Sequence, residues 1–283
     1  MKRILILGKG SYIGDSFAQY LRRYEGGYIC DFAEAMRGEW EAISFAGYDA
    51  VYHVAGLVHL KERSDMEKEY YSVNCGLAVR CAEKAKAEGV PLFVFPSSIG
   101  VYGIYPGRID KNTVPRPITY YGKSKLKAEA ALRELESDTF KVAVLRPPMV
   151  YGYGCKGNFP VLVRYADKLP VFPNYKNRRS MIFIDNLSEF VRRVIDRGEG
   201  GLYFPQNCEY VSTCDLIKKV CEYRGGKIKL TGAFNFLIPI IKRGVFQKIF
   251  GDLYYDFHDD DISVVDFEES IKLSVADHKI KNT

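Results

Sequence analysis

Residues 3–14 read Arg-Ile-Leu-Ile-Leu-Gly-Lys-Gly-Ser-Tyr-Ile-Gly, and this stretch decides the fold. The apolar run at 3–7 predicts a strand that is buried on both faces, and a helix is expected to follow as far as Arg23. A glycine-rich turn between a strand and a helix lets the backbone approach a pyrophosphate at the helix N-terminus. The turn residues expected to contact such a group are Gly8, Gly10, Ser11, Tyr12, Ile13 and Gly14.

Strand and helix patterns alternate beyond this turn. Strands are predicted at 28–32, 49–54, 92–96 and 142–145, with helices at 74–88 and 120–136 between them. This alternation predicts an α/β fold of the Rossmann type, a doubly wound parallel sheet with helices on both faces. The predicted dinucleotide domain comprises residues 1–147 and 182–205, and a smaller substrate domain comprises 148–181 and 206–283.

Composition excludes several classes of protein. The chain has 283 residues, a net charge of +6 and a pI of about 8.8, which suits an anionic ligand such as a nucleotide. No basic block with interleaved aromatic residues predicts nucleic-acid binding, and no apolar run is long enough for membrane insertion. The seven cysteines form no Cys-x-x-Cys motif, so we expect no metal site and a reduced, cytoplasmic protein.

Further residues are predicted to contact the cofactor. Asp31 lies 17 residues past Gly14, near the place where a carboxylate holds the adenine ribose hydroxyls of NAD. Arg37 follows closely and can accept the 2′-phosphate of NADP, so both cofactors stay open and NAD is favoured. The small residues of Val54-Ala55-Gly56 follow a predicted strand and allow a close approach of the backbone to a ligand.

Ser98, Tyr121 and Lys125 are the candidate catalytic residues. Tyr121 and Lys125 are four residues apart, which places both side chains on one face of a helix. A nearby ammonium favours a phenolate, so Lys125 is expected to lower the pKa of Tyr121. A serine hydroxyl can hold a substrate oxygen beside the phenol. The three groups together can move a proton on or off an alcohol while a hydride is exchanged at the same carbon.

Residues 1–205 resemble the extended short-chain dehydrogenase/reductase family, in its nucleotide-sugar epimerase/dehydratase branch. The motifs that carry the resemblance, in chain order, are the turn ending in Tyr12-Ile13-Gly14, His53-Val54-Ala55-Gly56, the helix residue Asn74, Ser97-Ser98-Ile99-Gly100-Val101-Tyr102-Gly103, Tyr121-x-x-x-Lys125, Leu145-Arg146-Pro147-Pro148-Met149-Val150-Tyr151-Gly152, and Arg179-Ser180-Met181-Ile182-Phe183-Ile184-Asp185-Asn186-Leu187. The turn departs from the family pattern at Ser11, which replaces the middle glycine.

The resemblance implies a role for each of these segments. Ser98, Tyr121 and Lys125 match the catalytic set, and Pro148 lies in the segment that faces the nicotinamide. Asn158 and Arg179 match substrate residues near a uridine diphosphate, which implies a UDP-sugar substrate in polysaccharide precursor synthesis. Dehydratase members carry Asp-Glu where this chain has Ile99-Gly100, which argues against a 4,6-dehydratase. Relatives imply a homodimer.

Three functions remain open from the sequence. The favoured one is an NAD(P)-dependent 4-epimerase of a UDP-hexose or UDP-N-acetylhexosamine. A 4-keto-sugar reductase that consumes NAD(P)H uses the same residues, and a non-catalytic NAD(P)-binding sensor is the alternative from another class. Among other residues, His53 is interpreted as a satisfied core histidine, while His59 could face the substrate. The apolar segment 234–241 is expected to be a core helix of the smaller domain.

Overall fold

The structure is a computed structural model that describes residues 1–58, 60–103, 107–233, 235–238, 249–256, 261 and 263–276. The prediction for His59 and half of that for the segment 234–241 lie outside these ranges. Asn235–Leu237, within that segment, forms a 3₁₀ turn. Among the described residues no helix combines the length and the apolar character needed to cross a membrane, and no cluster of His, Cys, Asp or Glu has the make-up of a metal site.

The chain forms two compact units. The first comprises Met1–Ile104, Val114–Pro147 and Leu187–Pro205, and the second comprises Tyr105–Thr113, Pro148–Asn186 and Gln206–Thr283. The boundaries differ from the predicted domains at two places. Residues 107–109 belong to the second unit because they pair with a strand of the tail. Residues 182–186 also belong to the second unit.

A six-stranded parallel sheet is the centre of the first unit. Its order is β10-β6-β4-β3-β1-β2. The chain adds β2 on one side of β1 and then β3 on the other side, so the direction in which strands are added reverses at β1. Residues Ile4, Leu5, Ile6 and Leu7 of β1 are almost fully buried, as expected for a strand covered on both faces. The strands are β1 (Lys2–Leu7), β2 (Tyr28–Ala33), β3 (Ala50–His53), β4 (Leu92–Pro96), β6 (Lys141–Leu145) and β10 (Gly201–Tyr203).

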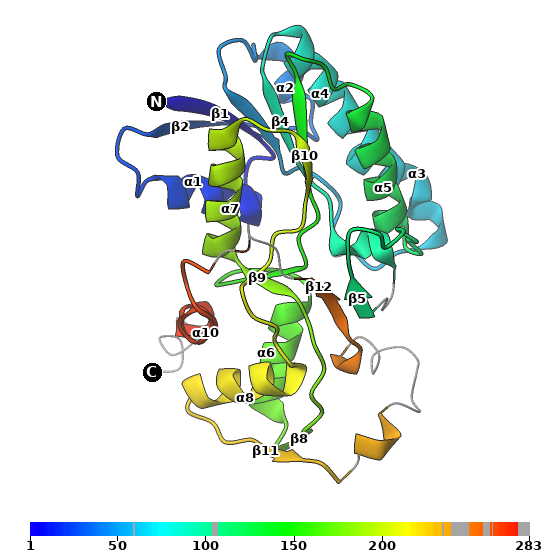
Figure 1. Cartoon of the computed structure of the whole chain (residues 1–283), viewed down its shortest axis with the longest axis vertical. Helices are drawn as coiled ribbons and strands as arrows, with labels where there is room; N and C mark the ends of the chain where they lie inside the picture. Colours follow the sequence, from blue (N-terminus) through cyan, green and yellow to red (C-terminus); the bar gives the residue numbers. More distant parts are fainter. Residues whose placement is uncertain are drawn as a thin grey trace. The chain divides into compact units, whose positions relative to one another are not determined.

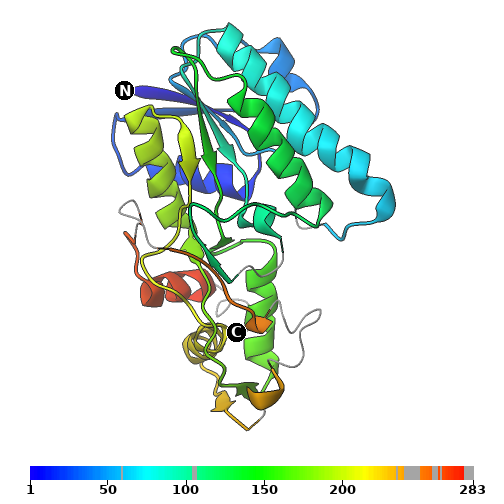
Figure 2. The ribbon, with the colours of Figure 1, turned by 45° about the vertical axis from the view of Figure 1, so that its right-hand side comes forward.

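Helices cover both faces of this sheet. Figures 1 and 2 show α1 and α7 on one face, with α4 and α5 side by side on the other. On α5 the buried face carries Lys125 and Glu129 beside Ala128 and Leu132, so the polar residues interrupt the apolar stripe. The helices are α1 (Tyr12–Leu21), α2 (Glu39–Ala42), α3 (Glu67–Tyr71), α4 (Ala78–Ala87), α5 (Tyr120–Arg133) and α7 (Ile184–Arg197).

The helix predicted from Asn74 begins earlier. α3 continues into a π-helical segment at Ser72–Leu77 and then into α4, so Asn74 lies inside a widened turn. Such turns leave the regular hydrogen-bond ladder and are frequent at functional sites.

The described residues of the second unit form short, parallel strand pairs and helices. β7 pairs with β9, β8 with β11 and β5 with β12. Its buried centre includes Tyr151, whose hydroxyl contacts Ser270 at 2.6 Å and accepts a bond from Asn207. The elements are β5 (Gly107–Ile109), β7 (Met149–Tyr151), α6 (Asn158–Lys168), β8 (Val171–Pro173), β9 (Met181–Phe183), α8 (Thr213–Tyr223), β11 (Lys229–Thr231), β12 (Leu253–Tyr255) and α10 (Phe267–Val275).

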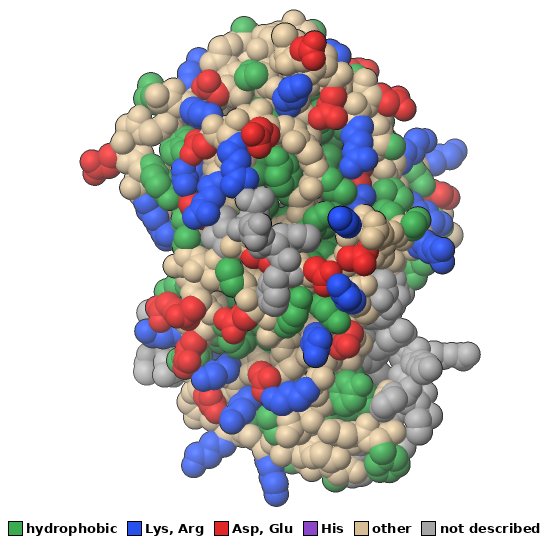
Figure 3. Space-filling view, viewed as in Figure 1, with side chains coloured by type: hydrophobic (Ala, Val, Ile, Leu, Met, Phe, Trp, Pro, Cys, Tyr) green, Lys and Arg blue, Asp and Glu red, His purple; other side chains and the backbone are tan. Residues whose placement is uncertain are grey.

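Charged side chains are mixed on the surface. Figure 3 shows basic residues interspersed with acidic ones on the face that it displays. Two acidic residues near the C-terminus are hydrogen-bonded: Asp256 accepts two bonds from the Arg108 guanidinium, and Asp261 accepts one from Gln206. Asp259 and Asp260 lie outside the described residues.

Candidate active site

The glycine turn fits close against the end of β3. Gly8 has a φ of 127°, and a Cβ there would lie 2.8 Å from the backbone nitrogen of Ala55. A Cβ on Gly14 would lie 2.9 Å from the side chain of Ile6. Gly10 has a φ of 77°, and a Cβ there would meet no atom within 4 Å, so its backbone borders open space. The turn therefore has the shape that lets a pyrophosphate approach the start of α1.

Ser11, which replaces the middle glycine of the family pattern, has a role that needs a side chain. It has an extended backbone with a φ of −80°, which needs no glycine, and it is the N-cap of α1. Its Oγ accepts a hydrogen bond from the Gly14 nitrogen at 3.1 Å. The departure from the family pattern therefore leaves the turn intact and adds a helix cap.

The segment after β3 lies beside the same turn. The backbone nitrogens of Val54 and Ala55 both donate to the Leu7 carbonyl at 2.9 Å. A Cβ on Gly56 would lie 2.9 Å from Asn74 Oδ1 and 3.7 Å from Lys125 Nζ. Gly56 thus permits Asn74 and Lys125 to come close to the backbone. Both segments lie where the strand order reverses, at the carboxyl ends of β1 and β3, where ligands bind in open α/β sheets.

Asn74 ties this segment to α5. Its Oδ1 accepts from the Leu57 nitrogen at 2.7 Å, and its Nδ2 donates to the Leu57 carbonyl and to Ser124 Oγ. Ser124 in turn donates to the Tyr121 carbonyl at 2.9 Å. The fully buried amide therefore holds the helix that carries two of the candidate catalytic residues.

The structure brings Ser98 and Tyr121 together. Ser98 follows β4 by two residues, and its Oγ accepts from the Gly100 nitrogen at 3.0 Å. The two side chains lie on the same side of Gly100, since a Cβ there would lie 3.3 Å from Ser98 Oγ and 3.8 Å from the Tyr121 ring. Burial raises the pKa of Tyr121 to about 12, and the Ser98 hydroxyl opposes the rise. The pKa of Tyr121 is therefore raised in this structure, whereas a lowered value was expected, because the cost of burying a phenolate dominates.

Lys125 is buried one turn along α5. Only 6% of its surface is exposed, its Nζ donates to the Pro96 carbonyl at 2.8 Å, and it lies 4.4 Å from the centre of the Phe95 ring. Burial lowers the pKa of Lys125 to about 8, and Glu129 opposes this effect. The ammonium and the neutral amine are therefore both accessible near neutral pH.

His53 is buried but is not satisfied. It stacks on Phe93 and Phe95, and both of its ring nitrogens lack a hydrogen-bond partner in the part of the chain that the structure describes. Burial and the neighbouring Lys125 lower the pKa of His53 to about 3, so the ring is neutral. It belongs to the core, as expected, while the expectation of paired nitrogens is wrong.

Asp31 does not lie at the carboxyl end of β2. Its carboxylate accepts from Arg3 at 3.2 Å and from the Tyr48 hydroxyl at 2.8 Å. Glu34 occupies the end of that strand, about 20 residues past Gly14, where a ribose-binding carboxylate is expected. The Gly8 nitrogen donates to the Ala33 carbonyl at 3.0 Å, so Glu34 adjoins the glycine turn. Arg37 is exposed nearby. Asp31 is therefore engaged beside the sheet, and Glu34 is the carboxylate that adjoins the glycine turn.

Glu62 is a residue that the sequence reasoning missed. Its two carboxylate oxygens accept from the backbone nitrogens of Tyr120 and Tyr121 at 3.0 and 2.9 Å. Thr119 caps the same helix by accepting from the Gly122 nitrogen at 3.0 Å. The start of α5 is therefore held by a loop carboxylate that is far away in the sequence. An acid in a loop of this kind leaves no periodic signal, so only the fold reveals it.

The remaining predicted residues lie in the second unit. Asn158 is exposed as the first residue of α6, after Gly157, and Pro148 is buried before β7. The Arg179 backbone pairs with Val211, and its guanidinium donates to the Gly251 carbonyl at 3.2 Å. The structure gives each residue a place within this unit, and their contacts with substrate remain predictions.

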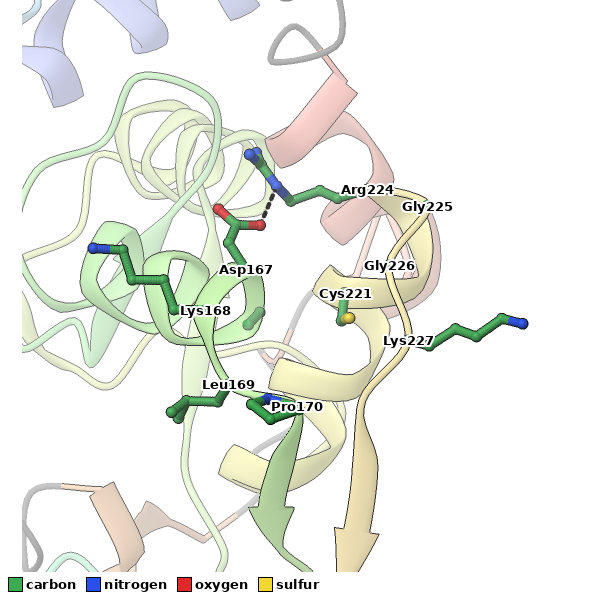
Figure 4. Close-up of a pocket in the computed structure, with 10 residues that line it drawn as sticks. Asp167, Lys168, Leu169, Pro170, Cys221, Arg224, Gly225, Gly226 and Lys227 are labelled. Atoms are coloured by element: carbon green, nitrogen blue, oxygen red, sulfur yellow. Dashed lines mark hydrogen bonds and ion pairs between the residues drawn. The ribbon is translucent and has the colours of Figure 1, made fainter.

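A cavity of about 450 Å³ lies elsewhere in the second unit. It is an open cavity bordered by the C-terminal ends of α6 and α8 and the loops that follow them (Figure 4). Arg224 bonds to Asp167 at 2.6 Å beside it, while Lys168 and Lys227 point away from each other. None of the predicted site residues lines this cavity.

Comparison with known proteins identifies a family and several relatives. The model of the NAD dependent epimerase/dehydratase family matches residues 28–203. The UDP-glucose 4-epimerase of Vibrio cholerae is 28% identical over 257 residues, which are 86% of this chain and 76% of that protein. The matched segments span 34–52% of the length of seven further curated relatives.

Two solved structures share the fold over nearly the whole chain. The UDP-glucuronic acid 4-epimerase of Bacillus cereus in complex with NAD is 16% identical, with a TM-score of 0.77 over 97% of this chain and 95% of that one. RMD of Pseudomonas aeruginosa complexed with NADPH is also 16% identical, with a TM-score of 0.73 over 97% and 99% of the two chains. At this identity the likeness concerns the fold.

Proposed function

The chain belongs to the NAD-dependent epimerase/dehydratase family, and from this premise we propose that it is a nucleotide-sugar 4-epimerase. Its proposed substrate is a UDP-hexose or a UDP-N-acetylhexosamine. The observation that carries the proposal is the pair of Ser98 and Tyr121, whose side chains both lie next to Gly100, with Lys125 buried one turn further along α5. This is the set of groups that oxidation of a sugar alcohol needs, and Ile99-Gly100 supplies no acid for dehydration.

The first unit offers a site that suits NAD. The close contact at Gly8, the open space at Gly10 and the N-terminus of α1 together fit a pyrophosphate. Glu34 is the proposed partner of the adenine ribose hydroxyls, which favours NAD over NADP. Lys125 is the proposed partner of the nicotinamide ribose. When bound, the cofactor supplies a hydride acceptor and returns the hydride.

The protein groups have separate tasks in the proposed reaction. Ser98 holds the C4 oxygen of the sugar beside the Tyr121 hydroxyl. Tyr121 takes the proton of that oxygen in one direction and returns it in the other. Because burial raises the pKa of Tyr121 to about 12, its ionisation requires an added positive charge, and the ammonium of Lys125 is the one that α5 carries on the same face. Arg179 and Asn158 are the proposed partners of the diphosphate.

The test begins with the purified protein and no added nucleotide. We expect denaturation to release NAD, and the native protein to interconvert UDP-glucose and UDP-galactose, or their N-acetyl forms, without net use of cofactor. A protein that is isolated without NAD and oxidises added NAD(P)H only with a 4-keto sugar would instead be a reductase. A protein that binds neither cofactor nor any UDP-sugar would refute the proposal.

A tyrosine variant separates catalysis from cofactor sensing. We expect Tyr121→Phe to lower kcat by about 10³-fold, since one acid–base group contributes about 10²–10⁴, and to retain NAD. A sensor would keep its output in this variant. Cytoplasmic location, a role in polysaccharide precursor synthesis and a homodimer are parts of the same proposal, and sedimentation of the purified protein tests the last.

A further inference from the structure

A buried ion pair lies beside the candidate catalytic residues. The Arg146 guanidinium donates to both carboxylate oxygens of Glu129, at 3.0 Å from Nε to Oε1 and 2.5 Å from Nη2 to Oε2. Arg146 Nη1 also donates to the Tyr102 hydroxyl at 2.7 Å, and Ser97 Oγ donates to Glu129. Glu129 and Arg146 are only 3% and 5% exposed.

The pair joins the segment around Ser98 to the catalytic helix. Ser97 immediately precedes Ser98, and Tyr102 ends the 3₁₀ turn that Ser98 caps. Glu129 belongs to α5, one turn past Lys125, and Arg146 follows β6 directly. The four side chains therefore hold the segment on both sides of Ser98 and connect it to the helix that carries Tyr121.

Stability alone does not account for this arrangement. Burying two charges costs several kcal/mol per ion, and replacing a buried pair with apolar residues of similar volume is often neutral or stabilising. The nearby backbone is already held, because the Ser97 nitrogen donates to the Leu145 carbonyl and the Ile99 nitrogen to the Pro147 carbonyl. The charges of the pair therefore call for a functional reason.

The charge of Glu129 acts on Lys125. Several groups lie near Lys125: on β3, neutral His53; on β4, the Phe95 ring and the Pro96 carbonyl; on the π-helical segment, the Asn74 amide; and on α5 itself, Glu129. Glu129 is the acid of this set. Its carboxylate opposes the burial that favours the neutral amine.

We propose that Glu129 is a positioning residue, which fixes Ser98 against α5 through Ser97 and Arg146 and keeps Lys125 charged. Arg146 is the counter-ion of this carboxylate inside the protein. The inference rests on the proposed function for its catalytic consequence, since the ammonium of Lys125 is the charge that favours ionisation of Tyr121. The effect on Lys125 itself holds whatever the substrate.

The charge on Lys125 can be measured without activity. We would titrate the ¹³Cε signals of labelled lysines by NMR in the protein as purified, with Lys125 assigned from a Lys125→Arg variant. In Glu129→Gln we expect the pKa of Lys125 to fall by about one pH unit or more. The double variant Glu129→Gln/Arg146→Gln removes both charges together, which guards against unfolding, and it should also lower that pKa. Asp256→Asn, at the exposed Arg108 pair, is the control and should leave it unchanged.

Turnover gives the second readout. In the two Glu129 variants we expect kcat to fall with little change in KM, and the alkaline limb of the kcat profile to move to lower pH because Lys125 loses its proton earlier. Glu129→Asp should restore part of both effects. A pKa of Lys125 that is unchanged in both variants would overturn the inference. A shifted pKa in a protein that converts no nucleotide sugar would leave the inference standing and refute the proposed function.

Discussion

α1 and α5 both begin near the carboxyl edge of the same sheet, and their N-termini differ in what occupies them. The start of α1 is capped by Ser11 and borders the open space at Gly10. The start of α5 is capped by Thr119 and also bonds the Glu62 carboxylate through two backbone nitrogens. A helix N-terminus attracts anions. The start of α5 already binds an anion of this chain, the Glu62 carboxylate, whereas the start of α1 suits the phosphate of a ligand. One local signal thus serves binding in one helix and positioning in the other.

The largest effect is expected from a substitution in the glycine turn that precedes α1. In Gly8→Val a side chain must enter at a φ of 127° and 2.8 Å from the Ala55 nitrogen. We expect a loss of about 3–5 kcal/mol in the free energy of unfolding and loss of NAD binding. The control is Gly10→Ala, which also has positive φ but meets no atom within 4 Å and should lose about 1 kcal/mol. Urea unfolding and isothermal titration calorimetry measure both. Equal effects of the two variants would contradict the close contact.

The next effect concerns the cation that α5 buries. The pKa of Lys125 is lowered from 10.5 to about 8. Between these values the unfolded chain binds more protons than the folded one, so this group makes the free energy of unfolding rise with pH. We expect the wild-type value minus that of Lys125→Met to increase by up to about 3 kcal/mol over this window. Urea unfolding at pH 7.5, 8.5 and 9.5 shows the trend, and a difference independent of pH would argue against a buried cation.

Glu62→Gln tests the role of the carboxylate at the start of α5. The neutral amide oxygen accepts weaker hydrogen bonds than the carboxylate and loses the attraction to the helix dipole. We expect about 1–2 kcal/mol of lost stability and a several-fold fall in kcat, with NAD affinity retained. Glu67→Gln, on exposed α3, is the control and should change little. If NAD affinity fell as much as kcat, the division of tasks between the two helices would be wrong.

The smallest effects come from the two caps. Ser11→Ala and Thr119→Ala each remove one side-chain acceptor at a helix start, and each should cost about 1 kcal/mol of stability. Their functional effects should differ, because Ser11 lies in the proposed cofactor turn and Thr119 lies before Tyr121. We expect Ser11→Ala to weaken NAD binding and Thr119→Ala to lower kcat. The opposite assignment would contradict the comparison.

The sequence predicted the first unit well because its signals are local. A buried apolar strand, a glycine turn and a helix follow one another within residues 2–21, and the structure places β1 and α1 there. The pair Tyr121 and Lys125 depends only on helix periodicity, so its common face was predictable. No strand or helix is predicted from the sequence within 148–181, yet the structure has β7, α6 and β8 there. Strands of three residues such as β7 and β8 carry little periodic signal.

The sequence by itself determined the fold class, the family and the residues that can carry the chemistry, since these follow from short motifs in order along the chain. Only the tertiary structure decided the surroundings of those residues. It assigned Glu34 rather than Asp31 to the end of β2, brought Glu62 to the start of α5 and buried Arg146 against Glu129. It also reversed the expected pKa shift of Tyr121, because desolvation depends on the groups that surround a side chain and not on its neighbours in the sequence.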